Sequence, residues 1–332
     1  MEKECFLEFF QGDRAEWDRL AGAFPGFSLT QSWAFGEAKA ATGPWRVERA
    51  IFRRDGVIEG AAQVMARALP FGLGGLCWIN RGPLGRTGDP GAHLALLRRH
   101  YADKRRFYLR VAPPEGASPP ACDGFVPTGV LGWASARVDL AREPEDIRAA
   151  LKGRWRNYLG RAERSGAVVK DGATPADISL FIESYRHFLE GRGFTTSVSP
   201  GLIAALRDAS DETALRVLVA EHDGRVQGTL LLVLHGDTAE FLAGDTSDKD
   251  SPARVSRLLF WRAIEYARAA GCRWFDVGGL DPARTPPGIV QFKEGLGGEG
   301  YRLPEEIEAL PPGFAGLSAR LIRIRIGHAR GE

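Results

Sequence analysis

The pattern of apolar and polar positions first shows two strand–turn–strand segments, each with an Asp-Gly pair between two apolar runs. The first turn is Asp55-Gly56 and the second is Asp223-Gly224. Such a pair predicts a β-hairpin with a type I′ turn, because both central residues of that turn need positive φ. In each segment the second strand begins through a glycine, Gly60 or Gly228, and both the aspartates and these glycines lie 168 positions apart.

The order of the elements after each hairpin also repeats. A helix pattern at 93–103 and a strand pattern at 107–111 follow the first hairpin, and 256–269 and 274–277 follow the second. Because solenoid repeats are only ~20–50 residues long, this period indicates two duplicated domains. Chance is the alternative, since Asp-Gly hairpins are common. Each half mixes helices with a mostly antiparallel sheet, so we predict an α+β fold, typical of GNAT acyltransferases and present twice.

The predicted domain boundary follows a Pro-rich loop at 113–120 and lies near Ser135. We expect the first domain at 1–135 and the second at 136–302, with 303–332 returning to the first. The apolar and charged residues alternate at 321–326, which favours a terminal strand over a membrane-surface tether.

The clearest helix pattern covers about 145–164, and a further helix starts at Thr174-Pro175 and runs to about Leu189. One face of the helix at 145–164 is apolar and the other is basic. The basic residues are Arg148, Lys152, Arg154, Arg156, Arg161 and Arg164. This face predicts contacts with nucleic-acid phosphates, with a solvated amphipathic helix as the alternative.

Composition limits the classes of function. The net charge is only +2, which argues against a protein coated with positive charge for duplex binding. The four cysteines are scattered, with no CxxC and no zinc-type Cys/His spacing, so we predict no metal site and free thiols in a reducing cytoplasm. No apolar run reaches the ~20 residues that span a bilayer, and the N-terminus lacks a signal-peptide pattern. We therefore expect a cytoplasmic protein.

Four segments resemble, in order, motifs of the FemABX aminoacyltransferases. They are Leu29–Lys39, Asn80–Leu84, Trp155-Arg156-Asn157, and Phe292-Lys293 before Gly295-Leu296-Gly297-Gly298. The resemblance covers nearly the whole chain and implies two tandem GNAT-like domains. It also implies transfer of an amino acid from aminoacyl-tRNA to an amine, usually on a peptidoglycan precursor peptide. No cofactor is implied, and contact with a membrane-bound substrate would be peripheral.

Lys293 is the candidate for the chemistry, because only seven residues of the chain are Lys against 37 Arg. Aminolysis of an aminoacyl ester passes through an oxyanion, and a fixed cation aimed at it supplies ~10²–10³ in rate. The resemblance gives this catalytic role to Lys293, with Phe292 beside it. The alternative is a surface lysine paired with Glu294 or Asp281.

Six further residues, which lie in the matched motifs or near them, are predicted to bind substrate. They are Lys39, Trp33, Arg81, Arg156, Asp276 and Thr195. Three of them have a plainer alternative: Lys39 could be a helix-surface residue near Glu37, Arg81 could form a structural salt bridge, and Asp276 could satisfy backbone donors at its turn. Two acceptor-side positions differ from the family pattern, after Arg81 and after 192–196, so the acceptor stays open.

Two other functions compete. Acyl-CoA-dependent GNAT enzymes bind the pyrophosphate in a glycine-rich turn that opens a helix. The matching segment here, 250–257, reads Asp-Ser-Pro-Ala-Arg-Val-Ser-Arg and lacks both glycines. The other alternative is a non-catalytic GNAT-like protein of an envelope or exopolysaccharide system.

Overall fold

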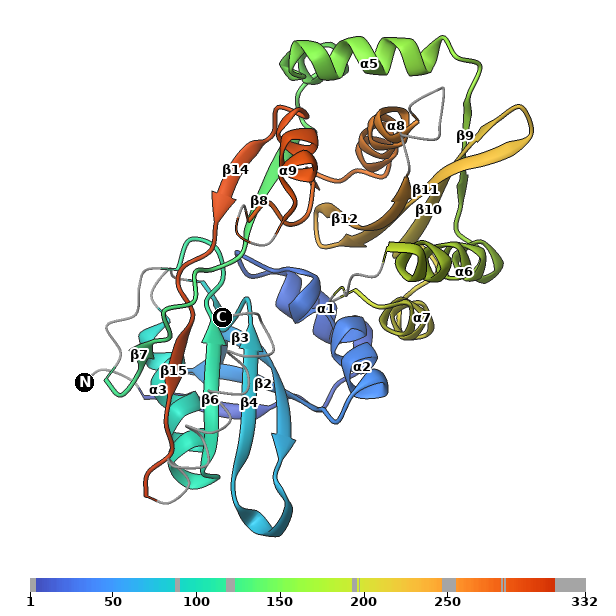
Figure 1. The fold of residues 1–332 in the computed structure, drawn as a ribbon. Coiled ribbons are helices and arrows are strands. Elements are labelled where there is room, and N and C mark those ends of the chain that lie inside the picture. Colours follow the sequence, from blue (N-terminus) through green and yellow to red (C-terminus); the bar gives the residue numbers. More distant parts are fainter. Residues whose placement is uncertain are drawn as a thin grey trace. The chain divides into compact units, whose positions relative to one another are not determined.

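The computed structural model describes residues 4–86, 90–117, 123–192, 196, 198–246, 255–281, 283 and 285–313. The chain divides into two compact units, and each contains one sheet with its helices (Figure 1). The first unit comprises 1–133 and 302–332, and the second comprises 134–301.

The first unit is built on a mixed sheet in which the described strands are mostly antiparallel. Their order is β1 (Cys5–Phe9), β2 (Arg46–Arg54), β3 (Val57–Ala68), β4 (Gly75–Asn80), β6 (Phe107–Ala112), β15 (Ile307–Ala309) and β7 (Val126–Pro127), with β5 (Leu84–Gly85) beside β3. β4 and β6 run parallel. β15 comes from the C-terminal part of the chain and pairs with both β6 and β7. A buried ion pair, Arg110 Nε to Glu306 Oε2 at 2.5 Å, reinforces this pairing.

Alternation along the first sheet separates two apolar cores. Phe52 and Ala62 face α3 (Gly91–Leu97) and the π-helical η3 (Arg98–Lys104), whereas Ile51 and Ala61 face α1 (Arg14–Gly22). Successive strand residues point to opposite faces, so each strand contributes to both cores. α2 (Trp33–Thr42) and the single turns η1 (Leu29–Gln31) and η2 (Pro70–Gly72) complete the described helices of this unit.

The second unit has the same kind of sheet. The described order is β14 (Glu299–Arg302), β8 (Ala134–Asp139), β13 (Trp274–Asp276), β12 (Thr238–Thr246), β11 (Arg225–His235), β10 (Leu215–His222) and β9 (Val168–Gly172). β12 and β13 run parallel. The helices are α4 (Pro144–Ala150), α5 (Gly153–Glu163), α6 (Pro175–Arg192), α7 (Pro200–Ala209), α8 (Ser256–Ala269) and α9 (Pro287–Glu294). α5 and α8 bury their apolar faces against one side of the sheet, while α6 contacts β10 and β12.

Both predicted hairpins are confirmed. Asp55 and Gly56 have φ of 52° and 78°, and Asp223 and Gly224 have 50° and 72°, as a type I′ turn requires. Each hairpin also has a bulge beside its entry glycine, at Phe52/Arg53 in the first and Ala220/Glu221 in the second. The predicted α+β fold is therefore present twice. The two copies also share the bulge, which the sequence pattern did not predict.

The single helix predicted at about 145–164 is wrong in its continuity. The chain forms α4 and α5 instead, with extended backbone at Leu151 and Lys152 between them. The amide of Lys152 donates to Gly295 O, at the end of α9, at 3.0 Å. In a continuous helix this amide would instead donate to a carbonyl of the preceding turn. The short helix α9, which carries Lys293, was not predicted from the sequence. Among the described residues, no helix combines the length and the apolar character needed to cross a membrane.

Candidate active site

Lys293 is placed by two neighbouring elements of the second unit. β13 ends at Asp276 and leads into the Gly278-Gly279 turn, and α9 then carries Lys293 back to that turn. Gly278 has φ of 71°, and a Cβ there would lie 3.0 Å from Phe241 O and 3.4 Å from Lys293 Nζ. A glycine is needed because a side chain would be strained by this φ and crowded by both groups.

The Lys293 side chain is buried, with only 7% of the residue exposed. Its Nζ donates to Gly279 O at 3.1 Å and lies 5.1 Å from the centre of the Phe241 ring. An ammonium has three N–H donors, so this bond leaves two for other acceptors. The alternative of a surface lysine paired with Glu294 or Asp281 does not hold, because Lys293 is buried, and Glu294 pairs with Lys152 at 3.2 Å.

Two carboxylates of adjacent strands balance the buried ammonium. Asp276 on β13 and Glu240 on β12 are register partners, and both are buried. Burial lowers the pKa of Lys293 to about 8, while the charges of Asp276 and Glu240 act to raise it. Burial, and then the charge of Glu240, raise the pKa of Asp276. Lys293 is therefore a desolvated cation that still holds its proton at neutral pH.

Hydrogen bonds fix Asp276 in place. Its Oδ1 accepts from Ser135 Oγ at 2.5 Å and from the amide of Gly278 at 2.8 Å, and its Oδ2 accepts from the Tyr301 hydroxyl at 2.5 Å. Asp276 thus satisfies a backbone donor at the turn, which was the plainer of its two interpretations. Sequence reasoning missed Ser135, Tyr301 and Glu240, because no local motif marks residues that meet only through strand pairing.

Phe292 belongs to an aromatic cluster against the core of the second unit. Its ring centre lies 5.0 Å from that of Phe260 and 5.9 Å from that of Trp155. A Cβ at Gly295 would come within 2.4 Å of Trp155 Cδ1, so this glycine lets the end of α9 approach α5. The motif residues Trp155, Phe292 and Gly295 thus hold the helix that carries Lys293.

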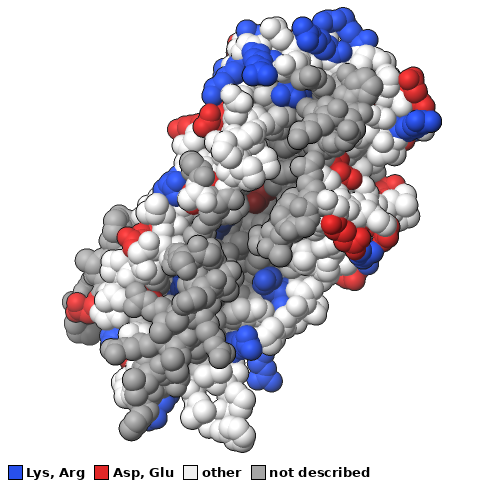
Figure 2. Space-filling model, viewed as in Figure 1, with Lys and Arg blue, Asp and Glu red and all other residues white. Residues whose placement is uncertain are grey.

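The basic face of α4 and α5 is partly neutralised within the unit. Arg148 makes two hydrogen bonds to the Glu163 carboxylate, and Arg156 Nη1 donates to Ala149 O at 2.9 Å. Arg154 and Arg161 are exposed and contact the Tyr158 ring. Lys and Arg side chains gather over α5 in Figure 2. Arg156 supports the end of α4, and its contact with substrate stays a prediction.

In the first unit, Lys39 lies in the last turn of α2 and is half-buried, which lowers its pKa. The neighbouring Glu37 forms a 2.8 Å ion pair with Arg49 instead. Glu37 therefore already has a cationic partner, and the binding of an anion by Lys39 stays a prediction.

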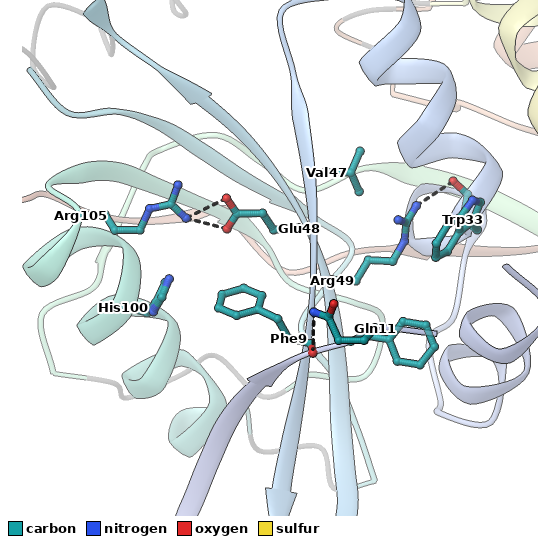
Figure 3. Close-up of a pocket in the computed structure, with 9 residues that line it drawn as sticks. Phe9, Gln11, Trp33, Val47, Glu48, Arg49, His100 and Arg105 are labelled. Carbon is teal, nitrogen blue, oxygen red and sulfur yellow. Dashed lines mark hydrogen bonds and ion pairs between the residues drawn. The ribbon is translucent and has the colours of Figure 1, made fainter. Parts of the chain in front are cut away.

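Trp33 lines a cavity of about 550 Å³ at the edge of β2. The Arg49 guanidinium stacks on its ring at 3.4 Å and donates to its carbonyl oxygen, and the Glu48–Arg105 ion pair lies further along the same cavity (Figure 3). Of the charged groups that line this cavity, Glu48 and Arg105 are thus paired with each other, and Arg49 is paired with Glu37.

Arg81 stands beside the network that joins the first two family-like motifs. The buried Gln31 donates to Asn80 O at 2.7 Å and accepts from the amide of Gln63 at 2.8 Å. Arg81 itself has φ of 55° and lies over the Trp133 ring at 5.4 Å. Both motifs therefore have a structural role. Thr195 and the segment 250–254, on which the CoA argument rests, lie outside the described residues.

Comparison with known proteins supports two GNAT-like domains. Residues 145–294 match the family described as an acetyltransferase (GNAT) domain. FemX has a similar structure, with a TM-score of 0.78 and 17% identity over 95% of this chain and 100% of that chain. The C-terminal domain of a putative lysylphosphatidylglycerol synthetase from Agrobacterium fabrum gives 0.55 and 15%, over 95% and 97%. A tandem GNAT protein from the clavulanic acid biosynthesis pathway gives 0.52 and 14%, over 93% and 100%. No curated protein matches the chain.

Proposed function

We propose that this chain, which has a FemABX/GNAT-like fold, is an acyltransferase that moves an amino acid from aminoacyl-tRNA to an amine acceptor. The observation that carries the proposal is the buried ammonium of Lys293 beside the Gly278-Gly279 turn. A cation in an apolar setting stabilises a nearby negative charge far better than one in water. Aminolysis of an ester needs such a group, because negative charge develops on the carbonyl oxygen.

The proposed reaction joins two substrates without a bound cofactor. The acceptor amine attacks the ester carbonyl carbon, and a C–N bond forms. The oxyanion then collapses, the C–O bond to the tRNA ribose breaks, and the amine proton is transferred to the departing ribose oxygen. Lys293 stabilises the oxyanion, and Phe292 holds α9 against the core. Asp276 acts through Lys293 by keeping a negative charge near its ammonium.

The remaining predicted residues are assigned to binding. We assign Lys39, Trp33 and Arg81 to the acceptor side, where a half-buried lysine suits an anionic group such as the carboxylate or phosphate of a peptidoglycan precursor. The exposed Arg154 and Arg161 suit phosphates of the tRNA acceptor arm. Thr195 and Arg156 keep their proposed contacts with substrate. The proposed place of the reaction is the cytoplasm, where aminoacyl-tRNA is found.

An acyl-CoA donor is the second candidate, and the description of the matched domain as an acetyltransferase favours it. The absence of both glycines from 250–257 counts against it.

The two donors can be separated directly. The purified chain is incubated with radiolabelled aminoacyl-tRNAs and, in parallel, with labelled acetyl-CoA, each with a panel of amine acceptors. We expect transfer only from aminoacyl-tRNA and its loss after ribonuclease treatment. Ribonuclease-resistant transfer, or transfer from acetyl-CoA alone, would contradict the proposal.

A further inference from the structure

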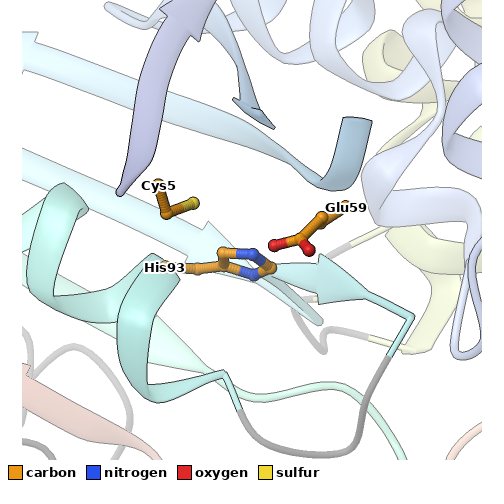
Figure 4. Close-up of side chains that lie close together, drawn as sticks. All are labelled: Cys5, Glu59 and His93. Carbon is orange, nitrogen blue, oxygen red and sulfur yellow. The ribbon is translucent and has the colours of Figure 1, made fainter. Parts of the chain in front are cut away.

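Three side chains of the first unit that are far apart in the sequence converge beside the β2–β3 hairpin. Cys5 lies on β1, Glu59 on β3 and His93 on α3. One potential ligand atom of each, the thiol sulfur, a carboxylate oxygen and a ring nitrogen, lies within 4.8 Å of the other two (Figure 4). Sequence spacing could not reveal this group, because strand pairing and helix packing bring the three residues together.

The fold places each of the three side chains by a specific feature. Glu59 is the extra residue of the bulge, since Phe52 pairs with Gly60 and Arg53 with Ile58. Bulges redirect side chains and are frequent beside functional sites. The equivalent bulge of the second unit has Gln227 at this position, an uncharged residue.

The His93 ring packs against both β2 and β3. Its ring stacks on Phe52 with centres 4.2 Å apart. A Cβ at Gly60 would lie 2.6 Å from His93 Cε1, so only glycine lets the imidazole come this close to β3. The imidazole is therefore fixed by packing before any ligand binds.

The donor set suits one class of ion. A thiolate, an imidazole and a carboxylate together favour zinc and similar borderline cations over magnesium or calcium, which prefer oxygen alone. Burial raises the pKa of the Cys5 thiol, and a bound cation would displace that proton. Arg54 Nε pairs with Glu59 Oε2 at 2.9 Å, and this contact orients the carboxylate.

We propose that Cys5, Glu59 and His93 form a binding site for a divalent cation of the zinc class. The ion takes three protein ligands and one water molecule in a tetrahedral arrangement. It joins β1 and α3 to the bulged hairpin, so its main effect is on the stability of the first unit.

The test uses the full chain without an affinity tag, because a histidine tag would itself bind zinc. The protein is kept reduced with a phosphine, demetallated, and titrated with Zn²⁺ by calorimetry and with Co²⁺ by absorption spectroscopy. We expect one equivalent of either ion, a thiolate-to-Co²⁺ charge-transfer band, and a rise in Tm with Zn²⁺. Failure to bind a stoichiometric ion would overturn the proposal.

Two variants locate the site and one serves as the control. Cys5→Ser should remove the charge-transfer band, and Cys5→Ser and Glu59→Gln should each weaken Zn²⁺ binding by at least about tenfold. Cys272→Ser removes another partly buried free thiol and should change neither the charge-transfer band nor the Zn²⁺ affinity. Circular dichroism of each apo-protein checks that the fold is kept. Zn²⁺ affinity that is unchanged in both site variants would show that the ion binds elsewhere and would overturn the proposal.

Discussion

At the scale of the residue, Lys293 carries its positive charge in a buried site, where desolvation disfavours the charged form. Its burial lowers the pKa from 10.5 to about 8, yet two buried carboxylates hold the proton in place. The ammonium is therefore present below about pH 8 and is lost as the pH rises through that value. A surface lysine would stay protonated to beyond pH 10.

The first prediction is that the rate of acyl transfer falls with an apparent pKa of about 8 on the alkaline side. The measurement is kcat/KM between pH 6 and 10, corrected at each pH for hydrolysis of the aminoacyl ester in the absence of the protein. A rate that stays constant up to pH 10 would mean that the charge of Lys293 plays no part.

The second prediction concerns Glu240, whose charge acts to raise the pKa of Lys293. Glu240→Gln removes that charge, so the alkaline limb of the pH profile should move to lower pH. Glu221→Gln is the matched control, because Glu221 lies on β10 of the same sheet and pairs with the exposed Lys170. A merely structural role for Glu240 would lower activity at every pH without moving the limb.

At the scale of the element, the position of Lys293 depends on α9. Two glycines of this segment allow the effect of packing to be distinguished from the effect of helix propensity. A Cβ at Gly295 would meet Trp155 at 2.4 Å, whereas one at Gly288 would meet nothing within 4 Å. Neither residue has positive φ, so the contrast is one of space alone.

The third prediction is that Gly295→Ala lowers the free energy of unfolding by about 1–3 kcal/mol, because it overpacks the contact with α5. Gly288→Ala should be neutral or stabilise by up to about 1 kcal/mol, because alanine is the better helix former. Urea unfolding of both variants measures the difference. Equal effects would show that α9 does not pack against α5 as described.

Elements differ in how far the sequence could predict them. The Asp-Gly hairpins were predictable because the turn type requires positive φ at those residues. α9 was not, because it is only eight residues long and begins at Pro287, within a Pro-rich stretch that reads as a loop. The break after α4 depends on a hydrogen bond from the Lys152 amide to Gly295 O, 143 positions away, and no local pattern can show that.

At the scale of the whole molecule, the duplicated fold was predictable from the repeated order of patterns, but the surroundings of Lys293 were not. The motif identified Lys293 and Phe292. Ser135, Glu240 and Tyr301 come from β8, β12 and β14, and they reach Asp276 or Lys293 only through the sheet.

The fourth prediction concerns the tRNA partner. Replacing both Arg154 and Arg161 with Ala should weaken tRNA binding and reduce its log–log salt slope by roughly 1.5, since each lost phosphate contact removes about 0.7–0.9. Filter binding at several salt concentrations measures this. Arg225→Ala, at an exposed position of the β10–β11 hairpin, is the control. An unchanged slope in the double variant would exclude α5 from the tRNA contact.

The most direct test of the central claim is single-turnover transfer by a Lys293→Ala variant. We expect the rate of transfer from aminoacyl-tRNA to fall by ~10²–10³, the usual cost of removing one oxyanion donor. Donor binding should be retained, and Lys170→Ala, which removes an exposed lysine paired with Glu221, should leave the rate unchanged. A folded Lys293→Ala protein that transfers the amino acid at the original rate would contradict the account.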